Sequence, residues 1–182
     1  NHDVQRIERL ITDYSQMLKD EVALSKEKMK KINIEPIIQS VVDDYNSIYK
    51  VKKDIKINYE DDGKKEYSIN GIENRIEQMI ANLLDNSISF TEKGGKIIVN
   101  ISISSNRKIT VKIIDEGQGF KEKDTSKIFR RFYSNRPDKF GEHSGLGLNI
   151  VKNLVELHDG KILASNRPNN KGAIIEISFP SM

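Results

Sequence analysis

Two asparagines about one helical turn apart could bind a metal ion together with a phosphate. The stretch ANLLDNSISF, residues 81–90, has helical apolar spacing and places Asn82 and Asn86 on one face. Burying two side-chain amides on an apolar helix is costly unless a ligand binds them. A carboxamide oxygen is a hard ligand that suits Mg²⁺, which commonly shares phosphate oxygens. Amides that cap neighbouring loops are the alternative.

A carboxylate follows directly after a predicted strand in the stretch DEGQGF, residues 115–120. Two isoleucines precede Asp115, so we expect it at the edge of the core. A carboxylate there can accept a hydrogen bond from the exocyclic amine of adenine, whereas guanine presents an oxygen at that position. Gly117 and Gly119 would let the backbone turn and the base lie close. An ordinary Asp-Gly turn is the alternative.

Three glycines, Gly141, Gly145 and Gly147, precede a predicted helix whose apolar residues begin at Leu148. Backbone N–H groups in a glycine-rich turn, followed by a helix N-terminus, form a favourable anion site. Ser144 could add a donor. A glycine-rich loop required only for helix packing is the alternative.

A short apolar patch interrupts the polar segment before these glycines, in KIFRRFYSN, residues 127–135. Its apolar members are Ile128, Phe129, Phe132 and Tyr133. They could simply anchor a long loop. Alternatively, the segment is a lid that closes over a ligand, with Arg131 available for a phosphate or a partner.

Hydrophobic periodicity predicts the elements that position these residues. We expect helices at 4–18, from Pro36 to Ile48, at about 71–91 and after Gly147, and strands at 32–34, 54–60, 66–70, 96–104, 108–116, 160–166 and 172–180. The last six strands are expected to form three hairpins. We therefore predict an α+β fold, a two-layer sandwich with a mixed, mainly antiparallel sheet and three helices on one face. This order excludes a repeated parallel βαβ fold.

Composition narrows the class of protein. The 182 residues are 36% hydrophobic and 31% charged, which is typical of a globular domain and not of a disordered chain. A net charge of +3 is too balanced to indicate a nucleic-acid partner. The absence of cysteine excludes disulfides and thiolate metal sites. No apolar run approaches the ~20 residues of a membrane span.

In this order, the four motifs resemble those of the ATP-binding catalytic domain of bacterial two-component sensor histidine kinases. That family belongs to the GHKL superfamily, together with gyrase B, Hsp90 and MutL. The N box resembles NLLDNSISF, the G1 box DEGQGF, the F box IFRRFY and the G2 box GEHSGLGLNIVKNLVELHDG. The stretch RFYSNRPDKFGEHSGLGL is also similar to ChvG-type sensor kinases of alphaproteobacteria.

The resemblance covers about residues 32–182 and implies a Bergerat fold with a lid at about 117–145. Residues 1–31 resemble the second helix of a dimerisation and phosphotransfer hairpin, followed by a linker. Mg²⁺ with ATP or ADP is the implied ligand. Asn82, Asn86 and Arg131 take catalytic positions, and Asn86 that of the metal ligand. The implied nucleotide-binding positions are Asn82, Asn86, Ser89, Asp115, Gly117, Gly119, Phe120, Phe132, Ser144, Gly145, Leu146, Gly147 and Leu148.

Two positions bear on the reaction. Many family members carry Lys or Arg at the place of Ser89, which cannot supply a cationic phosphate contact. Asn82 stands where the superfamily's ATPases carry a Glu that activates water, and an amide is no general base. Asp85 is expected to face a different direction. Hydrolysis should therefore be slow, and transfer of the γ-phosphoryl group to a histidine is favoured.

The sequence has three histidines, His2, His143 and His158, and none lies in a phosphoacceptor context. We expect the acceptor histidine upstream of Asn1. His158 precedes Asp-Gly at the end of a predicted helix, where a partly cationic side chain would be favourable.

The resemblance also implies partners. These are the phosphoacceptor hairpin of the same protein, in cis or in trans, a response regulator and, in a full-length protein, a second copy; no nucleic acid is expected. It implies a cytoplasmic domain of an inner-membrane sensor. Two other functions stay open: a non-catalytic nucleotide-binding scaffold whose lid ATP orders, and a GHKL ATPase.

Overall fold

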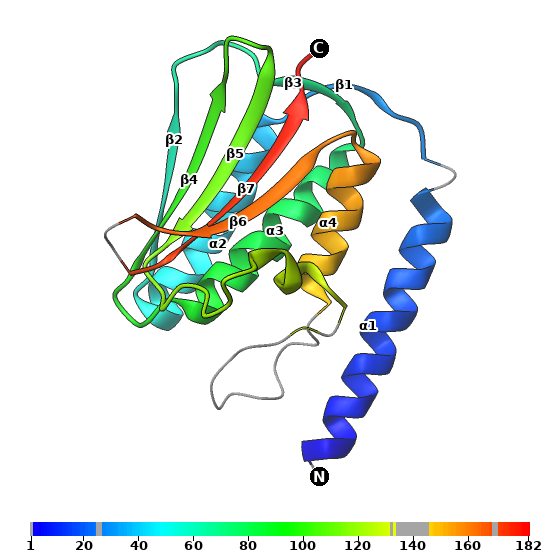
Figure 1. Ribbon diagram of the computed structural model, residues 1–182, viewed down its shortest axis with the longest axis vertical. Helices are drawn as coiled ribbons and strands as arrows, with labels where there is room; N and C mark the ends of the chain where they lie inside the picture. Colours follow the sequence, from blue (N-terminus) through cyan, green and yellow to red (C-terminus); the bar gives the residue numbers. More distant parts are fainter. Residues whose placement is uncertain (1, 25–26, 132, 134–145, 169–170) are drawn as a thin grey trace.

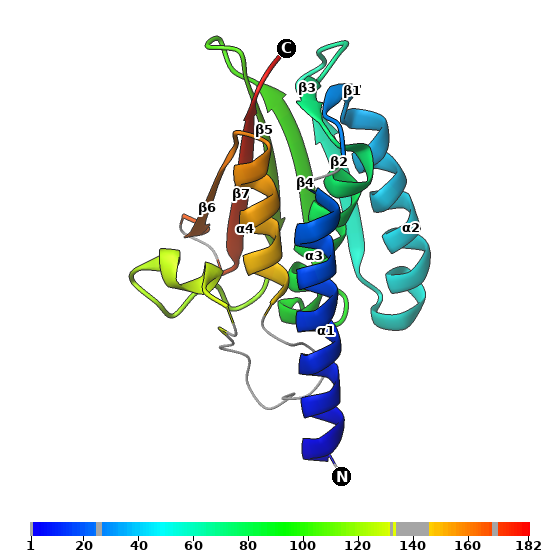
Figure 2. The same cartoon turned by 90° about the vertical axis from the view of Figure 1, so that its right-hand side faces the viewer.

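The computed structural model describes residues 2–24, 27–131, 133, 146–168 and 171–182. Within these residues the chain forms two layers, a five-stranded sheet and three helices that cover one of its faces (Figures 1 and 2). The covering helices are α2 (Glu35–Lys53), α3 (Glu73–Phe90) and α4 (Gly147–Leu157). The predicted α+β class is therefore confirmed.

The main sheet is mixed and mainly antiparallel, as predicted. In spatial order its strands are β2 (Lys56–Asp61), β4 (Lys96–Ile103), β5 (Lys108–Asp115), β7 (Ala173–Pro180) and β6 (Lys161–Asn166). Only the β2–β4 pair among these is parallel. The predicted β4–β5 and β6–β7 hairpins are both present. Alternate residues of β5 point into the core, which places its last residue, Asp115, on the helix-covered side.

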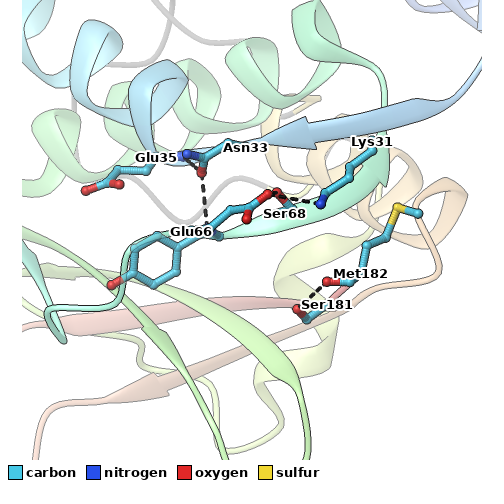
Figure 3. A network of polar contacts seen from close by, with 8 residues as sticks. Lys31, Asn33, Glu35, Glu66, Ser68, Ser181 and Met182 are labelled. Atoms are coloured by element: carbon cyan, nitrogen blue, oxygen red, sulfur yellow. Dashed lines mark hydrogen bonds and ion pairs between the residues drawn. The ribbon is translucent and has the colours of Figure 1, made fainter.

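A second, two-stranded sheet joins β1 (Lys30–Asn33) to β3 (Ser68–Gly71) in antiparallel register. Figure 3 shows the polar contacts around it. Asn33 Oδ1 accepts hydrogen bonds from the backbone N–H groups of Glu35, at 3.3 Å, and Tyr67, at 3.2 Å. One asparagine therefore fixes the start of α2 against the segment that enters β3.

The last residues of the chain contact the same small sheet. The backbone N–H of Met182 donates to the carbonyl of Ser68 at 2.9 Å. Beside it, Lys31 Nζ lies 3.1 Å from Glu66 Oε1, which also accepts a hydrogen bond from the Ser68 hydroxyl (Figure 3). The segment after β7 thus connects the small sheet to the main one.

The predicted hairpin between residues 54–60 and 66–70 is wrong. β2 pairs with β4, whereas β3 pairs with β1, in the other sheet. The loop after β2 is held elsewhere, because Asp62 accepts hydrogen bonds from the backbone N–H of Ile103 at 2.8 Å and from the Tyr67 hydroxyl. The loop therefore turns toward the end of β4 instead of folding back along β2.

The core lies between the helices and the inward face of the main sheet. α3 runs through its centre and buries one apolar stripe: Ile76, Met79, Ile80, Leu83 and Leu84. This is the long helix predicted at 71–91, with bounds shifted by one or two residues.

Helix α1 (His2–Leu24) stands beside the sandwich in Figure 1. Its apolar face is exposed: Val4, Ile7 and Ile11 keep 49%, 55% and 60% of their surface accessible. Among the described residues, no helix combines the length and the apolar character needed to cross a bilayer.

Candidate functional site

The C-terminal half of α3 carries both predicted amides. Asn86 is 9% exposed and Asn82 is half-buried. The last turn of this helix is fixed by donors from outside its backbone: the Thr91 hydroxyl donates to the carbonyl of Ser87 at 2.8 Å, and Lys53 Nζ donates to that of Ile88 at 3.0 Å. The Ser87 carbonyl also accepts from the backbone N–H of Thr91 at 3.0 Å, and Lys53 supplies a donor to a carbonyl near the helix end, so the turn that carries Asn86 is held in place.

Ser89 uses its hydroxyl within the same helix. Its Oγ donates to the carbonyl of Asn86 at 2.6 Å. The hydroxyl thus stabilises the backbone of the predicted metal ligand. This geometry agrees with the expectation that Ser89 does not replace the cationic residue found in many family members.

Asp85 faces α2, which agrees with the prediction that it points away from the face of Asn82 and Asn86. Its Oδ1 accepts a hydrogen bond from the Tyr45 hydroxyl at 2.9 Å, and that hydroxyl also lies 3.2 Å from the carbonyl of Ala81. Burial, and next the Asp85 carboxylate, raise the pKa of Tyr45 far above its ordinary value. The carboxylate nearest to Asn86 in sequence is therefore engaged in helix packing.

Asp115 ends β5 as a buried carboxylate, 3% exposed. Its Oδ1 accepts hydrogen bonds from the backbone N–H groups of Gly117 at 2.9 Å and Ala173 at 3.1 Å. Burial raises the pKa of Asp115, and these two hydrogen bonds oppose that rise because they favour the charged form. Both of these hydrogen bonds go to Oδ1, and the Ser87 side chain also lowers the pKa of Asp115.

The first G1-box glycine is required by close packing. A Cβ on Gly117 would lie 2.7 Å from the carbonyl oxygen of Phe90, so the segment after β5 packs directly on the end of α3. Gly119 has φ 77°, which disfavours other residues. Both glycines were singled out in the sequence, and the packing of Gly117 against Phe90 brings the N box and the G1 box together.

Two residues that flank the β6–β7 turn, the last residue of β6 and the residue before β7, pack against the G1 box although sequence reasoning missed them. Asn166 accepts a hydrogen bond from the backbone N–H of Phe120 at 2.6 Å and donates to its carbonyl at 3.0 Å. Gly172 has φ 126°, and a Cβ there would lie 1.9 Å from the carbonyl oxygen of Asp115. A glycine directly before a strand was the available signal, since it often marks close backbone approach.

The first half of the F-box segment is anchored. It contains the short 3₁₀ helix η1 (Thr125–Phe129), where Ile128 and Phe129 are buried. Thr125 Oγ1 donates to the carbonyl of Ala164 on β6 at 2.7 Å. The prediction of an aromatic anchor is confirmed for these residues, whereas closure of a lid stays a prediction. Arg131, just beyond η1, is exposed.

The G2 box enters α4 at Gly147, preceded by the fully buried Leu146. A Cβ on Gly147 would meet no atom of the described residues within 4 Å; Leu148 follows, half-buried. Asn149 Nδ2 donates to the carbonyl of Phe129 at 3.0 Å, which joins α4 to η1. Among the described residues its buried Oδ1 has no hydrogen-bond partner. Three predicted site residues, Phe132, Ser144 and Gly145, lie outside the described residues.

His158 corrects an expectation. It is 3% exposed, its Nδ1 donates to the carbonyl of Leu154 at 2.7 Å, and its Nε2 accepts from the backbone N–H of Ile72 at 3.1 Å. A ring nitrogen that accepts a hydrogen bond carries no proton, so this histidine is neutral and not partly cationic. Burial lowers its pKa. It joins the end of α4 to the start of α3.

Comparison with known proteins supports the grouping of these motifs. Residues 71–182 match the family "Histidine kinase-, DNA gyrase B-, and HSP90-like ATPase". The chain is 35% identical to sensor protein ChvG of Rhizobium meliloti (strain 1021), over 98% of this chain and 32% of that protein. The chain therefore spans about a third of the length of that relative.

Solved structures of histidine kinases share the fold of this chain. The catalytic domain of histidine kinase ThkA superposes with a TM-score of 0.72 at 26% identity, covering 85% of this chain and 97% of that one. A structure of ThkA in complex with the response regulator TrrA gives a TM-score of 0.73 at 24% identity, covering 97% of this chain and 49% of that one. By its family match and its relatives, the chain belongs to the histidine kinase-, DNA gyrase B- and HSP90-like ATPase family, within which it groups with the sensor histidine kinases.

Proposed function

We propose that this chain is the catalytic domain of a sensor histidine kinase, which binds Mg²⁺-ATP and transfers the γ-phosphoryl group to a histidine of a phosphoacceptor hairpin. One observation favours phosphoryl transfer to a histidine over hydrolysis of ATP. The site face of α3 presents the amides of Asn82 and Asn86, while the nearby carboxylate of Asp85 is bonded to Tyr45. Amides orient ligands but do not deprotonate water.

The residues present fit a nucleotide. Asp115 supplies a buried acceptor suited to an exocyclic amine. The backbone at Gly147 begins a helix, and no atom of the described residues lies within 4 Å of a Cβ built on it, an arrangement that suits phosphate oxygens. Asn149 Oδ1, two residues further along α4, is buried and has no hydrogen-bond partner among the described residues. Buried polar groups are normally bonded, so this atom fits a site that a ligand or water completes.

The metal would be held by Asn86. Its carboxamide oxygen is a hard, uncharged ligand, and the bonds from Ser89 and Lys53 keep its turn of α3 fixed. When bound, Mg²⁺-ATP supplies the γ-phosphoryl group, with the metal balancing charge on its oxygens. Asn82 would orient that group, and Arg131 could neutralise it from the lid.

The partners follow from the same proposal. Residues 1–31 would contribute the second helix of the hairpin and a linker, with residues 32–182 as the catalytic domain. The phosphorylated histidine would then pass its phosphoryl group to a response regulator, the class of protein bound in the ThkA complex. We place the domain on the cytoplasmic side of a membrane-anchored sensor that acts as a homodimer.

Transfer to an added hairpin tests the proposal. Radiolabelled ATP, Mg²⁺ and this chain should label the histidine of a phosphoacceptor hairpin from a related sensor kinase, while the chain alone stays unlabelled. Asn86→Ala should reduce the labelling rate at least ~100-fold, as expected when a metal ligand is removed. Asn100→Ala, a matched change on the half-buried outer face of β4, should leave it unaltered.

Two outcomes would contradict the proposal. Label on the chain by itself would show an acceptor within it, and full labelling by Asn86→Ala would remove the metal assignment.

A non-catalytic scaffold is the second candidate, because the Ser89 hydroxyl is bonded to a helix carbonyl and no cation stands in its place. Nucleotide binding without any transfer would favour that function, and rapid phosphate release would favour an ATPase.

A further inference from the structure

Strand β6 has one edge that does not pair with another strand, since it lies at the end of the main sheet. Phe120, at the end of the G1 box, and Thr125, five residues later, contact this strand. Thr125 Oγ1 donates to the carbonyl of Ala164, and the backbone of Phe120 bonds to the side chain of Asn166. Such cover protects an otherwise open strand edge. These two contacts also hold Phe120 and Thr125 against β6.

The Asn166 side chain makes two hydrogen bonds to the backbone of Phe120. Its Oδ1 accepts from the N–H of Phe120 at 2.6 Å, and its Nδ2 donates to the carbonyl of the same residue at 3.0 Å. A primary amide presents one acceptor and one donor side by side, so it can pair with the N–H and the C=O of a single residue. A Cβ on Gly119 would lie 2.6 Å from Asn166 Oδ1, so the approach is close.

The same turn also holds the start of the G1 box. Ala173 donates its backbone N–H to Asp115 Oδ1 at 3.1 Å, and Arg167 Nη1 lies 3.5 Å from the carbonyl of Asp115. Residues 115–120 are therefore fixed at both ends by one turn, at Asp115 through Ala173 and at Phe120 through Asn166.

We propose that Asn166 is a positioning residue for adenine recognition, which fixes the peptide segment from Asp115 to Phe120 in the shape that receives the base. This inference rests on the proposed nucleotide site and adds a residue that does not itself touch the nucleotide. Loss of the amide should weaken recognition of the base. The phosphate contacts from α3 and α4 should remain, because Asn166 bonds to neither helix in the described contacts.

Calorimetric titration with ADP and GDP in Mg²⁺ tests this role. For Asn166→Ala we expect ADP affinity to fall about 5–10-fold, in line with the loss of two hydrogen bonds. GDP affinity should change little, so the ADP-to-GDP preference falls by the same factor. Asn166→Asp keeps an acceptor for the Phe120 N–H and should lie between wild type and Asn166→Ala. Ser165→Ala, an exposed neighbour on β6, is the matched control and should equal wild type.

These measurements distinguish failure of the Asn166 positioning role from failure of the proposed nucleotide site. A wild-type chain that binds no ADP overturns both. If wild type binds ADP and Asn166→Ala loses only thermal stability, with its ADP-to-GDP preference intact, the positioning role is wrong while the nucleotide site stands. Should Asn166→Ala fail to fold, the comparison rests on Asn166→Asp, and unchanged base preference in that variant likewise overturns the role.

Discussion

Asp115 illustrates how function and stability oppose each other at a single side chain. The carboxylate is buried at the end of β5, and burial raises its pKa although two backbone N–H groups donate to it. A folded-state pKa above the unfolded value means that the folded state favours the protonated form. The stability contributed by that protonation is fully present below the unfolded pKa and lost as pH rises through the folded pKa.

Asp115→Asn should therefore keep or raise the melting temperature at pH 7, because a neutral amide avoids the cost of a buried charge and its oxygen can still accept both hydrogen bonds. ADP affinity should fall at least ~10-fold, the cost of losing a charged acceptor. Preference for adenine over guanine should also decline, because the amide can donate to a carbonyl oxygen. Scanning calorimetry and titration with ADP and GDP measure these changes. A lower melting temperature with unaltered base preference would contradict the assignment.

For individual residues, the sequence predicted the positions that follow from spacing along a single helix or strand. The common face of Asn82 and Asn86 follows from helical periodicity, and Asp115 follows from its place after an alternating strand. Asn166 and Ala173 were missed because their bonds to the G1 box span 46 and 58 residues. Such contacts depend on which strands become neighbours, and no local pattern encodes that.

Among the elements, α3 and α4 both carry predicted site residues, and His158 joins the two helices. The ring bonds to Leu154 within α4 and to the backbone N–H of Ile72 at the start of α3, and it packs edge-on against Phe179. Burial lowers the pKa of His158, whereas the adjacent Asp159 opposes this. Protonation would remove the acceptor that Ile72 uses.

Because the folded pKa of His158 lies below the ordinary value of 6.5, its stabilising effect is present above pH 6.5 and lost as pH falls toward the folded pKa. We expect the free energy of unfolding of wild type to decline between pH 7.5 and pH 5. His158→Gln should be less stable at pH 7.5 by roughly 1–3 kcal/mol and should decline less over this window. Urea unfolding at several pH values measures both slopes. His2→Gln is the control, and equal slopes for His158→Gln and wild type would contradict the prediction.

The sequence predicted where the strands lie better than it predicted which strands pair. The β4–β5 hairpin was predicted correctly because its turn, between Ile103 and Lys108, is short. The hairpin expected between β2 and β3 was wrong, because the longer loop between them is held by Asp62 at the end of β4. Alternation identified each of these strands, but it did not identify their partners.

For the molecule as a whole, α1 presents an apolar face that the sandwich leaves exposed. Val4, Ile7 and Ile11 recur at helical spacing, and Tyr14 continues the row at 37% exposure. An isolated amphipathic helix gains stability mainly by packing that face against another element. In the proposed hairpin, the other helix and a second copy would supply this packing.

We therefore expect weak self-association of this chain through α1, visible as a concentration-dependent sedimentation coefficient. Ile7→Lys combined with Ile11→Lys should abolish the dependence, because charges would replace the apolar contact, and ADP affinity should stay unchanged. Gln5→Lys with Ser15→Lys adds charge at exposed positions and serves as the control. A wild-type chain that sediments as a monomer at millimolar concentration would contradict this expectation.

The position of β7 has a consequence for biosynthesis. This strand follows all others in the chain, yet it lies between β5 and β6, and the backbone at its start surrounds Asp115. On the ribosome, neither the sheet nor the proposed adenine site around Asp115 can be completed before residues 172–180 emerge. If the proposed function holds, a nascent chain should become competent for nucleotide in one late step, and a premature stop codon before Gly172 would leave a polypeptide with all four motifs and an incomplete site.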